Sequence, residues 1–232
     1  MRRSNDSQTC WIKTYERKGV FWVHDGNPKR PHALLTSGNH SDGFFWSGPV
    51  VDDDVAREAA VEEIIDFLEE QGVGIFDFDR VIGPATGATR LAEEMAFQVT
   101  ERRWTKDKDA EPCRWSSPKK LGDGSSKTIV LAEGDVRPGE RVLLIEDVIT
   151  TGGSVEANAE IIIAAGATVL PVLVALVNRS GLEKIAERRI LALIDRPMPM
   201  WAPEDCLLCK AGSEAIRPKK PVENWDRLTA QY

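Results

Sequence analysis

Residues 142–154 read VLLIEDVITTGGS, and this stretch decides the fold class. Four apolar residues run directly into two adjacent carboxylates, Glu146 and Asp147, and then into hydroxyls and glycines. An uninterrupted apolar run is typical of a strand that is buried on both faces of a parallel sheet. Paired acids at the end of such a strand repel each other unless a ligand or a positive group meets them. The stretch therefore predicts a buried strand whose carboxyl end binds something.

The rest of the chain predicts an α/β domain with a mainly parallel central sheet flanked by helices, because short apolar runs alternate with amphipathic segments. Strands are expected at 80–83, 129–132, 141–146, 168–177 and 190–194, and helices after Asp54, after Gly87, from about Ser154 and over 181–189. The first fifty residues suggest short strands and turns. The length suits a single domain over 1–232.

Two segments interrupt this pattern. Residues 101–127 are charged, contain Pro, Gly and Ser, and have no sustained apolar period. A segment of this kind inside a compact domain is usually a functional lid, so we expect a mobile lid loop there. Residues 197–232 are rich in proline and are expected to form an irregular C-terminal tail.

Composition narrows the functional classes. A net charge of −7 argues against a surface that coats nucleic acid. The longest apolar run, 161–177, is interrupted by Gly166 and Pro171, and no secretory signal is visible, so the chain is expected to be soluble and cytoplasmic, without a membrane partner. Four cysteines are too few for a disulfide scaffold. Cys206 and Cys209 form a CxxC that lacks two further ligands for tetrahedral zinc, and we expect a structural role for it.

The residues after the acid pair form a predicted phosphate cradle, made of Thr150, Thr151, Gly152, Gly153 and Ser154. Glycines let the backbone approach an anion, hydroxyls donate to it, and the N-terminus of the following helix adds free N–H groups. Carboxylates just before the cradle accept hydrogen bonds from a vicinal diol, so a phosphosugar fits both halves. The motifs GxxxxGK[ST] and GxGxxG are absent. The simpler alternative, a buried strand before a Thr- or Ser-capped helix, explains the hydroxyls but leaves the acids and glycines unexplained.

VLLIEDVITTGGS resembles the phosphoribosyl-pyrophosphate motif of the type I phosphoribosyltransferases. Three further stretches resemble orotate phosphoribosyltransferases within that family: HALLTSGNHSDGFF (32–45), RVIGPATGATRLAEEMA (80–96) and PEDCLLCKAG (203–212). The resemblance implies the type I phosphoribosyltransferase fold, with a small hood built from the N-terminal and C-terminal segments.

The resemblance also implies roles for particular residues. Those expected to bind phosphoribosyl pyrophosphate are Glu146, Asp147, Val148, Ile149, Thr150, Thr151, Gly152, Gly153, Ser154, Ala85, Thr86, Gly87, Ser37 and Gly38. Those expected to bind orotate are Phe44, Phe45, Thr150 and Arg179. The alternative for 32–45 is a strand–turn–strand with two core phenylalanines.

The lid departs from the family pattern. The Lys-x-x-Lys-x-His-Gly of the family is absent, and Thr36 and Thr86 stand where lysines often occur. Arg102 and Arg103, followed by Lys106 and Lys108, are the expected catalytic cations against pyrophosphate. The alternative is a solvated charged loop.

The implied activity is Mg²⁺-dependent transfer of ribose 5-phosphate from phosphoribosyl pyrophosphate to orotate, a step of pyrimidine biosynthesis. Mg²⁺ would be held mainly by substrate oxygens and water, so no set of protein metal ligands is expected. A homodimer is implied, because lids in this family act across the dimer interface. Two alternatives are a phosphoribosyltransferase for another base and a regulator that binds phosphoribosyl pyrophosphate without turnover.

Overall fold

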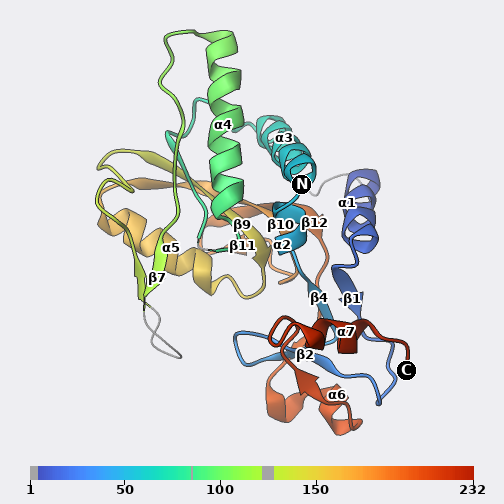
Figure 1. The fold of residues 1–232 in the computed structure, drawn as a ribbon. Helices are drawn as coiled ribbons and strands as arrows, with labels where there is room; N and C mark the ends of the chain where they lie inside the picture. The colour runs from blue at the N-terminus through green and yellow to red at the C-terminus, as the bar shows by residue number, and fades with distance from the viewer. Residues whose placement is uncertain (1–4, 85, 122–127) are drawn as a thin grey trace. The chain divides into compact units, whose positions relative to one another are not determined.

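The computed structural model describes residues 5–84, 86–121 and 128–232 and consists of two compact units (Figure 1). Unit 1 comprises Met1–Trp11 and Ser47–Arg196, and unit 2 comprises Ile12–Trp46 and Pro197–Tyr232. The sequence predicted one domain with a hood from both chain ends. Unit 2 is built from the same N-terminal and C-terminal segments as that hood. Among the described residues, no helix has the length and apolarity needed to cross a membrane.

A sheet of six strands forms the centre of unit 1 in the described part of the chain. Its order is β11 (Lys184–Ile185), β12 (Arg188–Asp195), β10 (Thr168–Asn178), β9 (Arg141–Ile149), β5 (Arg80–Ile82) and β6 (Arg114–Ser116). All neighbours pair in parallel except β11, which is antiparallel to β12. The predicted, mainly parallel sheet is confirmed. A separate hairpin joins β7 (Lys119–Leu121) and β8 (Thr128–Val130).

Helices cover both faces of this sheet (Figure 1). They are α2 (Gly48–Val51), α3 (Asp54–Glu70), α4 (Thr89–Lys106) and α5 (Gly153–Ala164). Alternate residues of β9 face opposite ways, and the set that contains Val142 and Leu144 packs with Val155 and Ile162 of α5. The helices α3 and α4 pack against each other and against β12, β5 and β6. The carboxyl ends of β5 and β9 therefore lead into α4 and α5 side by side.

The predicted helix at α3 is confirmed, although its buried face differs from the expected one. Asp53 caps it by accepting a 2.9 Å hydrogen bond from the Ala56 N–H. The sequence pattern places Val55, Ala59, Ile64, Phe67 and Leu68 on its apolar side, but Val55 and Ala59 are exposed. Ile64, Phe67 and Leu68 are buried as expected, and Ala60, Val61 and Ile65 are buried with them.

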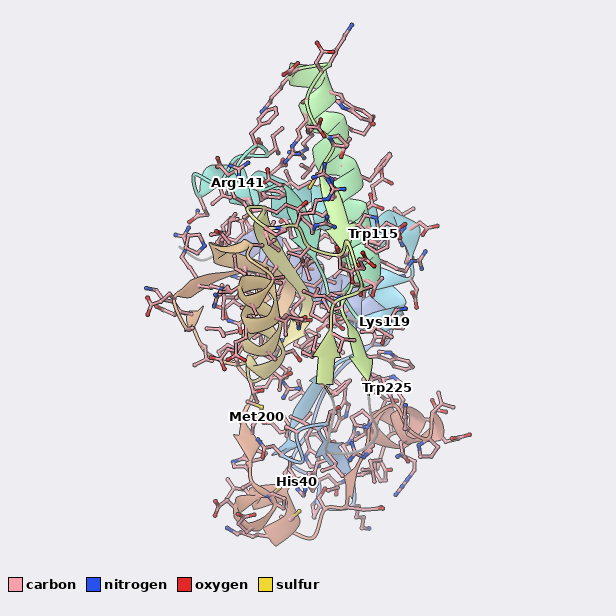
Figure 2. The ribbon with its side chains drawn as sticks, turned by 90° about the vertical axis from the view of Figure 1, so that its left-hand side faces the viewer. His40, Trp115, Lys119, Arg141, Met200 and Trp225 are labelled. Carbon is pink, nitrogen blue, oxygen red and sulfur yellow. The ribbon has the colours of Figure 1, made fainter. Side chains whose placement is uncertain are left out.

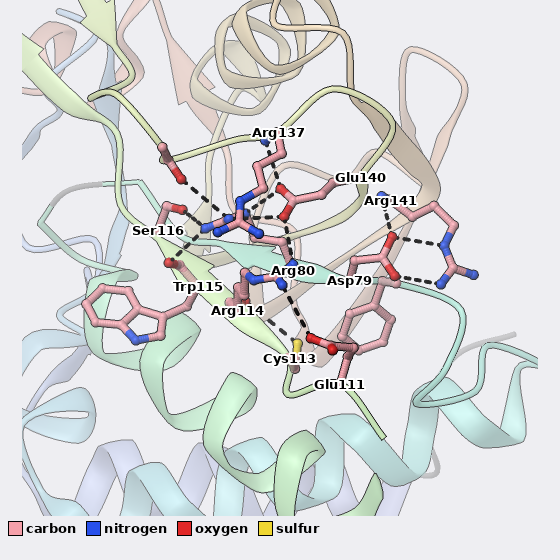
Figure 3. A network of polar contacts seen from close by, with 12 residues as sticks. Asp79, Arg80, Glu111, Cys113, Arg114, Trp115, Ser116, Arg137, Glu140 and Arg141 are labelled. Carbon is pink, nitrogen blue, oxygen red and sulfur yellow. Dashed lines mark hydrogen bonds and ion pairs between the residues drawn. The ribbon is translucent and has the colours of Figure 1, made fainter. Parts of the chain in front are cut away.

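A buried ion-pair network closes the amino ends of the central strands (Figure 3). Arg80 opens β5 and donates two hydrogen bonds to Glu140, from Nε to Oε2 at 2.8 Å and from Nη2 to Oε1 at 3.1 Å. Arg114 at the start of β6 reaches the same carboxylate at 3.2 Å, and the Arg137 N–H donates to it at 2.9 Å. The network ties three strand starts together at the edge opposite the predicted cradle.

Unit 2 is built around a sheet with the order β13 (Met200–Trp201), β3 (His40–Ser41), β2 (His32–Leu34) and β14 (Ala215–Ile216). Figure 2 labels two residues of neighbouring strands in it, His40 and Met200. One face of the sheet packs into an apolar cluster of Trp22, Ala33, Leu35, Ile216, Trp225 and Leu228. The strands β1 (Phe21–Val23) and β4 (Gly43–Phe45) form a second antiparallel pair.

Three segments differ from the sequence prediction. The C-terminal tail is not irregular, because it contributes β13, β14, α6 (Leu207–Lys210), α7 (Glu223–Thr229) and the short helix Pro203–Asp205. The first fifty residues include the helix α1 (Asn5–Arg17) as well as short strands. Residues 181–189 form no helix, because Lys184 and Ile185 pair with β12 across a tight turn.

Candidate active site

The acid pair lies inside β9, which continues to Ile149 beyond the predicted end at Glu146. Adjacent residues of a strand project to opposite faces. Glu146 lies on the face of Leu144, toward α5, and is 8% exposed. Asp147 therefore lies on the α4 face. The two carboxylates flank the strand end from opposite sides, which separates two negative charges that the sequence placed next to each other.

Asp147 contacts the turn between β5 and α4. A Cβ added to Gly87 would lie 2.5 Å from Asp147 Cγ, so a larger residue here would force the carboxylate to move. Gly83 is similarly constrained, because its Cβ would lie 2.8 Å from the carbonyl carbon of Ala88. The predicted pyrophosphate loop and the predicted diol acid, sixty residues apart in the sequence, thus meet at one point.

The predicted phosphate cradle forms the turn between β9 and α5. Gly152 adopts a left-handed conformation with φ of 86°, which glycine accepts without steric cost. Its Cα faces Ile185 of β11, where a Cβ would lie 2.9 Å from the side chain. Thr151, Gly153 and Ser154 are exposed at the start of α5, where the first N–H groups have no intrahelical acceptor. The turn thus has the geometry of an anion site.

Other predicted contacts of the phosphoribosyl group differ in exposure. Ile149 packs in the core, and its carbonyl accepts a 3.0 Å hydrogen bond from the Arg179 N–H, so its side chain is not a ligand contact. Val148 and Thr150 are half-buried, and Thr86 is exposed. Ala85 lies outside the described residues.

Arg179 follows β10, and its backbone bond to Ile149 sets it beside the carboxyl end of β9. Its side chain is 1% exposed, which makes it one of the largest fully buried side chains in the described part of the chain. The expected role in orotate binding stays a prediction.

The hood residues named from the sequence all lie in unit 2. Ser37 and Gly38 form the tight turn between β2 and β3, where the Gly38 N–H donates to the Leu35 carbonyl at 3.0 Å. Phe44 and Phe45 are adjacent in β4 and cannot both face one ring. Phe45 stacks on Phe21 with ring centroids 4.5 Å apart and is buried, so its predicted contact with orotate is replaced by a core role. Phe44 is the half-exposed member of the pair.

Three of the four expected lid cations, Arg102, Arg103 and Lys106, lie on a helix and not in a loop. Residues 101–106 form the last turns of α4, and β6 and β7 occupy part of the remaining segment; residues 122–127 lie outside the described residues. Arg103 is 4% exposed and donates to the carbonyls of Ile75, Phe78 and Glu111. This bonding makes Arg103 a packing residue, contrary to the prediction.

Arg102 and Lys106 also differ from expectation. Arg102 pairs with Asp66 at 2.7 Å and Lys106 with Glu69 at 3.5 Å, so both hold α4 against α3. Thirteen residues of helix separate Arg102 from Thr89, which corresponds to about 20 Å at 1.5 Å per residue. Within one chain, therefore, these cations are remote from Gly87. Lys108 is exposed beyond the helix end.

One cluster of functional side chains was missed from the sequence. In unit 2, His32, His40, Cys206 and Cys209 bring their ligand atoms within 4.8 Å of one another. The sequence shows the CxxC motif, but the histidines lie more than 160 positions earlier, so nothing local indicates that the four side chains meet. Histidine spacing gave no signal, because His24, His32 and His40 follow one another at intervals of eight residues and His24 is not in the cluster.

Comparison with known proteins agrees with this geometry. A family model described as the phosphoribosyl transferase domain matches residues 51–195, which include both glycine loops and the acid pair. The chain belongs to the phosphoribosyltransferase family. Relatives of this phosphoribosyltransferase are named orotate phosphoribosyltransferase. The one from Desulforamulus reducens is 31% identical over 187 residues, covering 81% of this chain and 87% of the relative. The one from Thermococcus gammatolerans is 35% identical over 152 residues, covering 66% and 72%.

Solved structures confirm the fold of this phosphoribosyltransferase. Orotate phosphoribosyltransferase from Aeropyrum pernix matches with a TM-score of 0.55 and 24% identity, covering 78% of this chain and 91% of that one. Adenine phosphoribosyltransferase from Saccharomyces cerevisiae matches with a TM-score of 0.56 and 13% identity, covering 80% and 99%. Because enzymes for different bases match equally well, the fold does not select the base.

Proposed function

We propose that the protein is an orotate phosphoribosyltransferase, which transfers ribose 5-phosphate from phosphoribosyl pyrophosphate to orotate in pyrimidine biosynthesis. The relatives that share about a third of their residues with most of this chain carry that name. The observation that carries the proposal is the contact between Gly87 and Asp147 at the ends of β5 and β9. It joins a backbone loop suited to pyrophosphate with an acid suited to the ribose diol.

In the proposed reaction, the bond between C1′ and pyrophosphate breaks as the orotate ring nitrogen attacks C1′. The cradle at the start of α5 binds the 5′-phosphate through N–H groups and hydroxyls. Glu146 and Asp147 accept hydrogen bonds from the ribose hydroxyls, and the backbone at Gly87 donates toward the leaving group. The protein thereby aligns the two reactants and stabilises developing charge, the main demands of this chemistry.

The residues present fit a magnesium ion of the expected kind. Glu146 and Asp147 offer carboxylate oxygens, which are the hard donors that Mg²⁺ accepts. Glu146 and Asp147 would hold it through the ribose hydroxyls, and bound Mg²⁺ would supply charge neutralisation at pyrophosphate.

The proposal is tested by the loss of orotate absorbance with phosphoribosyl pyrophosphate and Mg²⁺. Asp147→Asn is expected to abolish the loss, and the matched control Glu160→Gln, an exposed carboxylate of α5, is expected to retain it. A flat trace for the wild-type protein would reject orotate as the substrate. Adenine, guanine and hypoxanthine in the same assay then identify a different base.

A second candidate is a regulator that binds phosphoribosyl pyrophosphate without turnover. It is favoured by the bonding of Arg102 and Arg103 within the fold, which removes two expected lid cations. It predicts a calorimetric binding isotherm for phosphoribosyl pyrophosphate with no base consumed. Turnover of any base contradicts it.

We also propose that the protein acts as a homodimer in the cytoplasm. Phe97 and Trp104 are 62% and 43% exposed and lie seven residues apart, on one face of α4. Exposed aromatic pairs of this kind support an interface. Phe97→Glu is expected to convert the dimer to a monomer in light scattering, whereas Ile163→Glu, at a similarly exposed position on α5, is expected to leave it intact.

A further inference from the structure

Two histidines and two cysteines converge on one point of unit 2. The Nε2 atom of His32 lies 3.1 Å from Nδ1 of His40, 3.4 Å from Sγ of Cys206 and 3.5 Å from Sγ of Cys209. Sγ of Cys209 lies 3.3 Å from Nδ1 of His40. Zn–N bonds of about 2.05 Å and Zn–S bonds of about 2.3 Å give tetrahedral edges of about 3.3 Å between nitrogens and about 3.5 Å between nitrogen and sulfur. These four distances match the edges of a zinc tetrahedron, and the Cys206–Cys209 and Cys206–His40 edges lie within 4.8 Å.

The topology of the hood explains how the four side chains meet. Leu34 pairs with His40, and His32 lies two residues before Leu34, so both histidines project from the same face of the sheet. The opposite face carries Ala33 and the apolar cluster. The chain between β13 and β14 must pass from one edge of the sheet to the other. Cys206 and Cys209 lie on this crossover, and both sulfur atoms approach the histidine face.

Hydrogen bonding around His32 places the proton of its ring on Nδ1, so Nε2 carries a lone pair. The Ser213 hydroxyl donates its single proton to the Arg30 carbonyl at 2.6 Å, so it accepts from Nδ1 of His32 at 2.8 Å. The proton of a neutral His32 ring is thereby on Nδ1. Three potential donors then surround one lone pair on Nε2, and a lone pair satisfies only one of them. A cation at their centre satisfies all four groups.

The groups that contact His32 and Cys206 are also those expected around a metal site. A ligating histidine usually donates its other N–H to a fixed acceptor, as His32 does to Ser213. The Cys209 N–H points at Sγ of Cys206 at 3.4 Å, a contact that stabilises a thiolate. His32 and Cys206 are both fully buried, so water does not reach the cluster from their side.

We propose that His32, His40, Cys206 and Cys209 bind one structural zinc ion that fastens the C-terminal crossover to the β2–β3 hairpin. Two imidazoles and two thiolates in a tetrahedron select Zn²⁺ over the hard cation Mg²⁺, which takes oxygen ligands. Four protein ligands leave no open position, so the ion is structural and not catalytic. Binding releases the two thiol protons to solvent, and no redox change is involved.

The zinc ion would act on the turn that the sequence associates with pyrophosphate. His32 and His40 stand at either end of the segment that contains Ser37 and Gly38. A metal that joins these ends fixes the geometry of the turn and the register of β2 with β3. The inference concerns unit 2 alone and holds whichever base the enzyme uses.

Metal analysis of the reduced wild-type protein is the first test. Elemental mass spectrometry is expected to find one zinc per chain, and Co²⁺ substitution is expected to give the thiolate charge-transfer and intense visible bands of a four-coordinate site. A metal-free wild-type protein that develops no such bands on Co²⁺ titration overturns the proposal.

Matched variants locate the ligands. Cys206→Ser, Cys209→Ser, His32→Gln and His40→Gln are expected to lose the zinc, whereas the controls Cys10→Ser and His24→Gln, at the exposed cysteine and the remaining histidine, are expected to keep it. Ser213→Ala is expected to weaken affinity about 10- to 100-fold. Zinc retained in the Cys206/Cys209 double variant, or lost in either control, overturns the assignment.

A measurement on the wild-type protein covers the case in which ligand variants fail to fold. Stepwise mercurial titration is expected to modify exposed Cys10 without zinc release, and then to release one zinc as two further thiols react. Release of zinc when the first thiol is modified would contradict the proposed ligand set. Retention of zinc after three thiols are modified would contradict it as well.

Discussion

Gly87 illustrates how one missing side chain can matter to a site. Gly87→Ala would force its Cβ against the Asp147 carboxylate, so we expect kcat/KM to fall about 100-fold, the usual cost of displacing a reacting group by about 1 Å. Steady-state kinetics and circular dichroism together measure the effect. Gly74→Ala is the control, because its Cβ would lie 3.5 Å from its nearest neighbour, an ordinary contact. Unchanged kinetics in Gly87→Ala would show that the close contact between Gly87 and Asp147 does not contribute to catalysis.

Glu140 is the residue on which the amino end of the sheet depends. Removing one partner of a buried ion pair leaves an uncompensated charge, so Glu140→Gln is expected to lower the free energy of unfolding by about 3–5 kcal/mol at neutral pH. Urea unfolding measures this. The exposed carboxylate of Glu111, which reaches Arg114 at 3.5 Å, provides the control Glu111→Gln, with less than about 1 kcal/mol expected.

The same residue makes the effect depend on pH. Burial alone would raise the pKa of Glu140, but hydrogen bonds from Arg80 and the Arg137 N–H outweigh it and hold the pKa below its ordinary value of 4.5. Because the pKa is lower in the folded protein, this stabilisation is complete above pH 4.5 and is lost as pH falls through the lowered pKa. The gap between wild type and Glu140→Gln should therefore shrink in acid. A gap that stays constant would contradict the linkage.

At the scale of elements, the far end of α4 depends on Arg103. Arg103→Met would leave three backbone carbonyls without their donor, which corresponds to a loss of at least about 3 kcal/mol in unfolding free energy. Turnover per folded molecule is expected to stay unchanged, because the guanidinium is committed to packing. Arg102→Met, which removes only surface pairs, is the matched control. A fall in kcat with intact stability would restore Arg103 to a catalytic role.

The elements also show where sequence reasoning succeeds. The strand β9 and its glycine turn were predictable because an unbroken apolar run, two acids and two glycines are strong local signals. The helix α1 was missed because its sequence, NDSQTCWIKTYER, has few apolar residues, although the buried pair Trp11 and Tyr15 lies four residues apart, as on one face of a helix. The strand β11 was taken for a helix because only pairing of Lys184 and Ile185 with β12, a tertiary contact, makes it extended.

The candidate site was predictable to a similar degree. Glu146, Asp147 and the cradle are local in sequence, and the structure adds the contact with Gly87. The lid cations were misplaced because charge patterning does not distinguish a solvated loop from a helix end bonded to carbonyls. The histidine–cysteine cluster was missed because His40 and Cys206 are 166 positions apart in the sequence, and only the sheet order brings them together.

At the scale of the whole molecule, the two units should differ in their response to metal removal. Chelation of the proposed zinc is expected to open the crossover in unit 2, so limited proteolysis should cut within 197–232 first. The core of unit 1, with its parallel strands buried between helices, should persist as a fragment identified by mass spectrometry. Equal cleavage of both units after chelation, or cleavage of unit 1 first, would contradict this.

The division of the chain has a consequence for synthesis on the ribosome. Unit 2 is assembled from Ile12–Trp46 and Pro197–Tyr232, and all of Ser47–Arg196 is made between them. At about 5–20 residues per second, the nascent β2–β3 hairpin waits roughly 10–30 s for β13 and β14 to appear. During that interval both edges of the hairpin and the side chains of Ala33 and Leu35 lack their final cover. A ribosome that stalls before residue 197 therefore releases a chain with open strand edges, which is a natural client for chaperones.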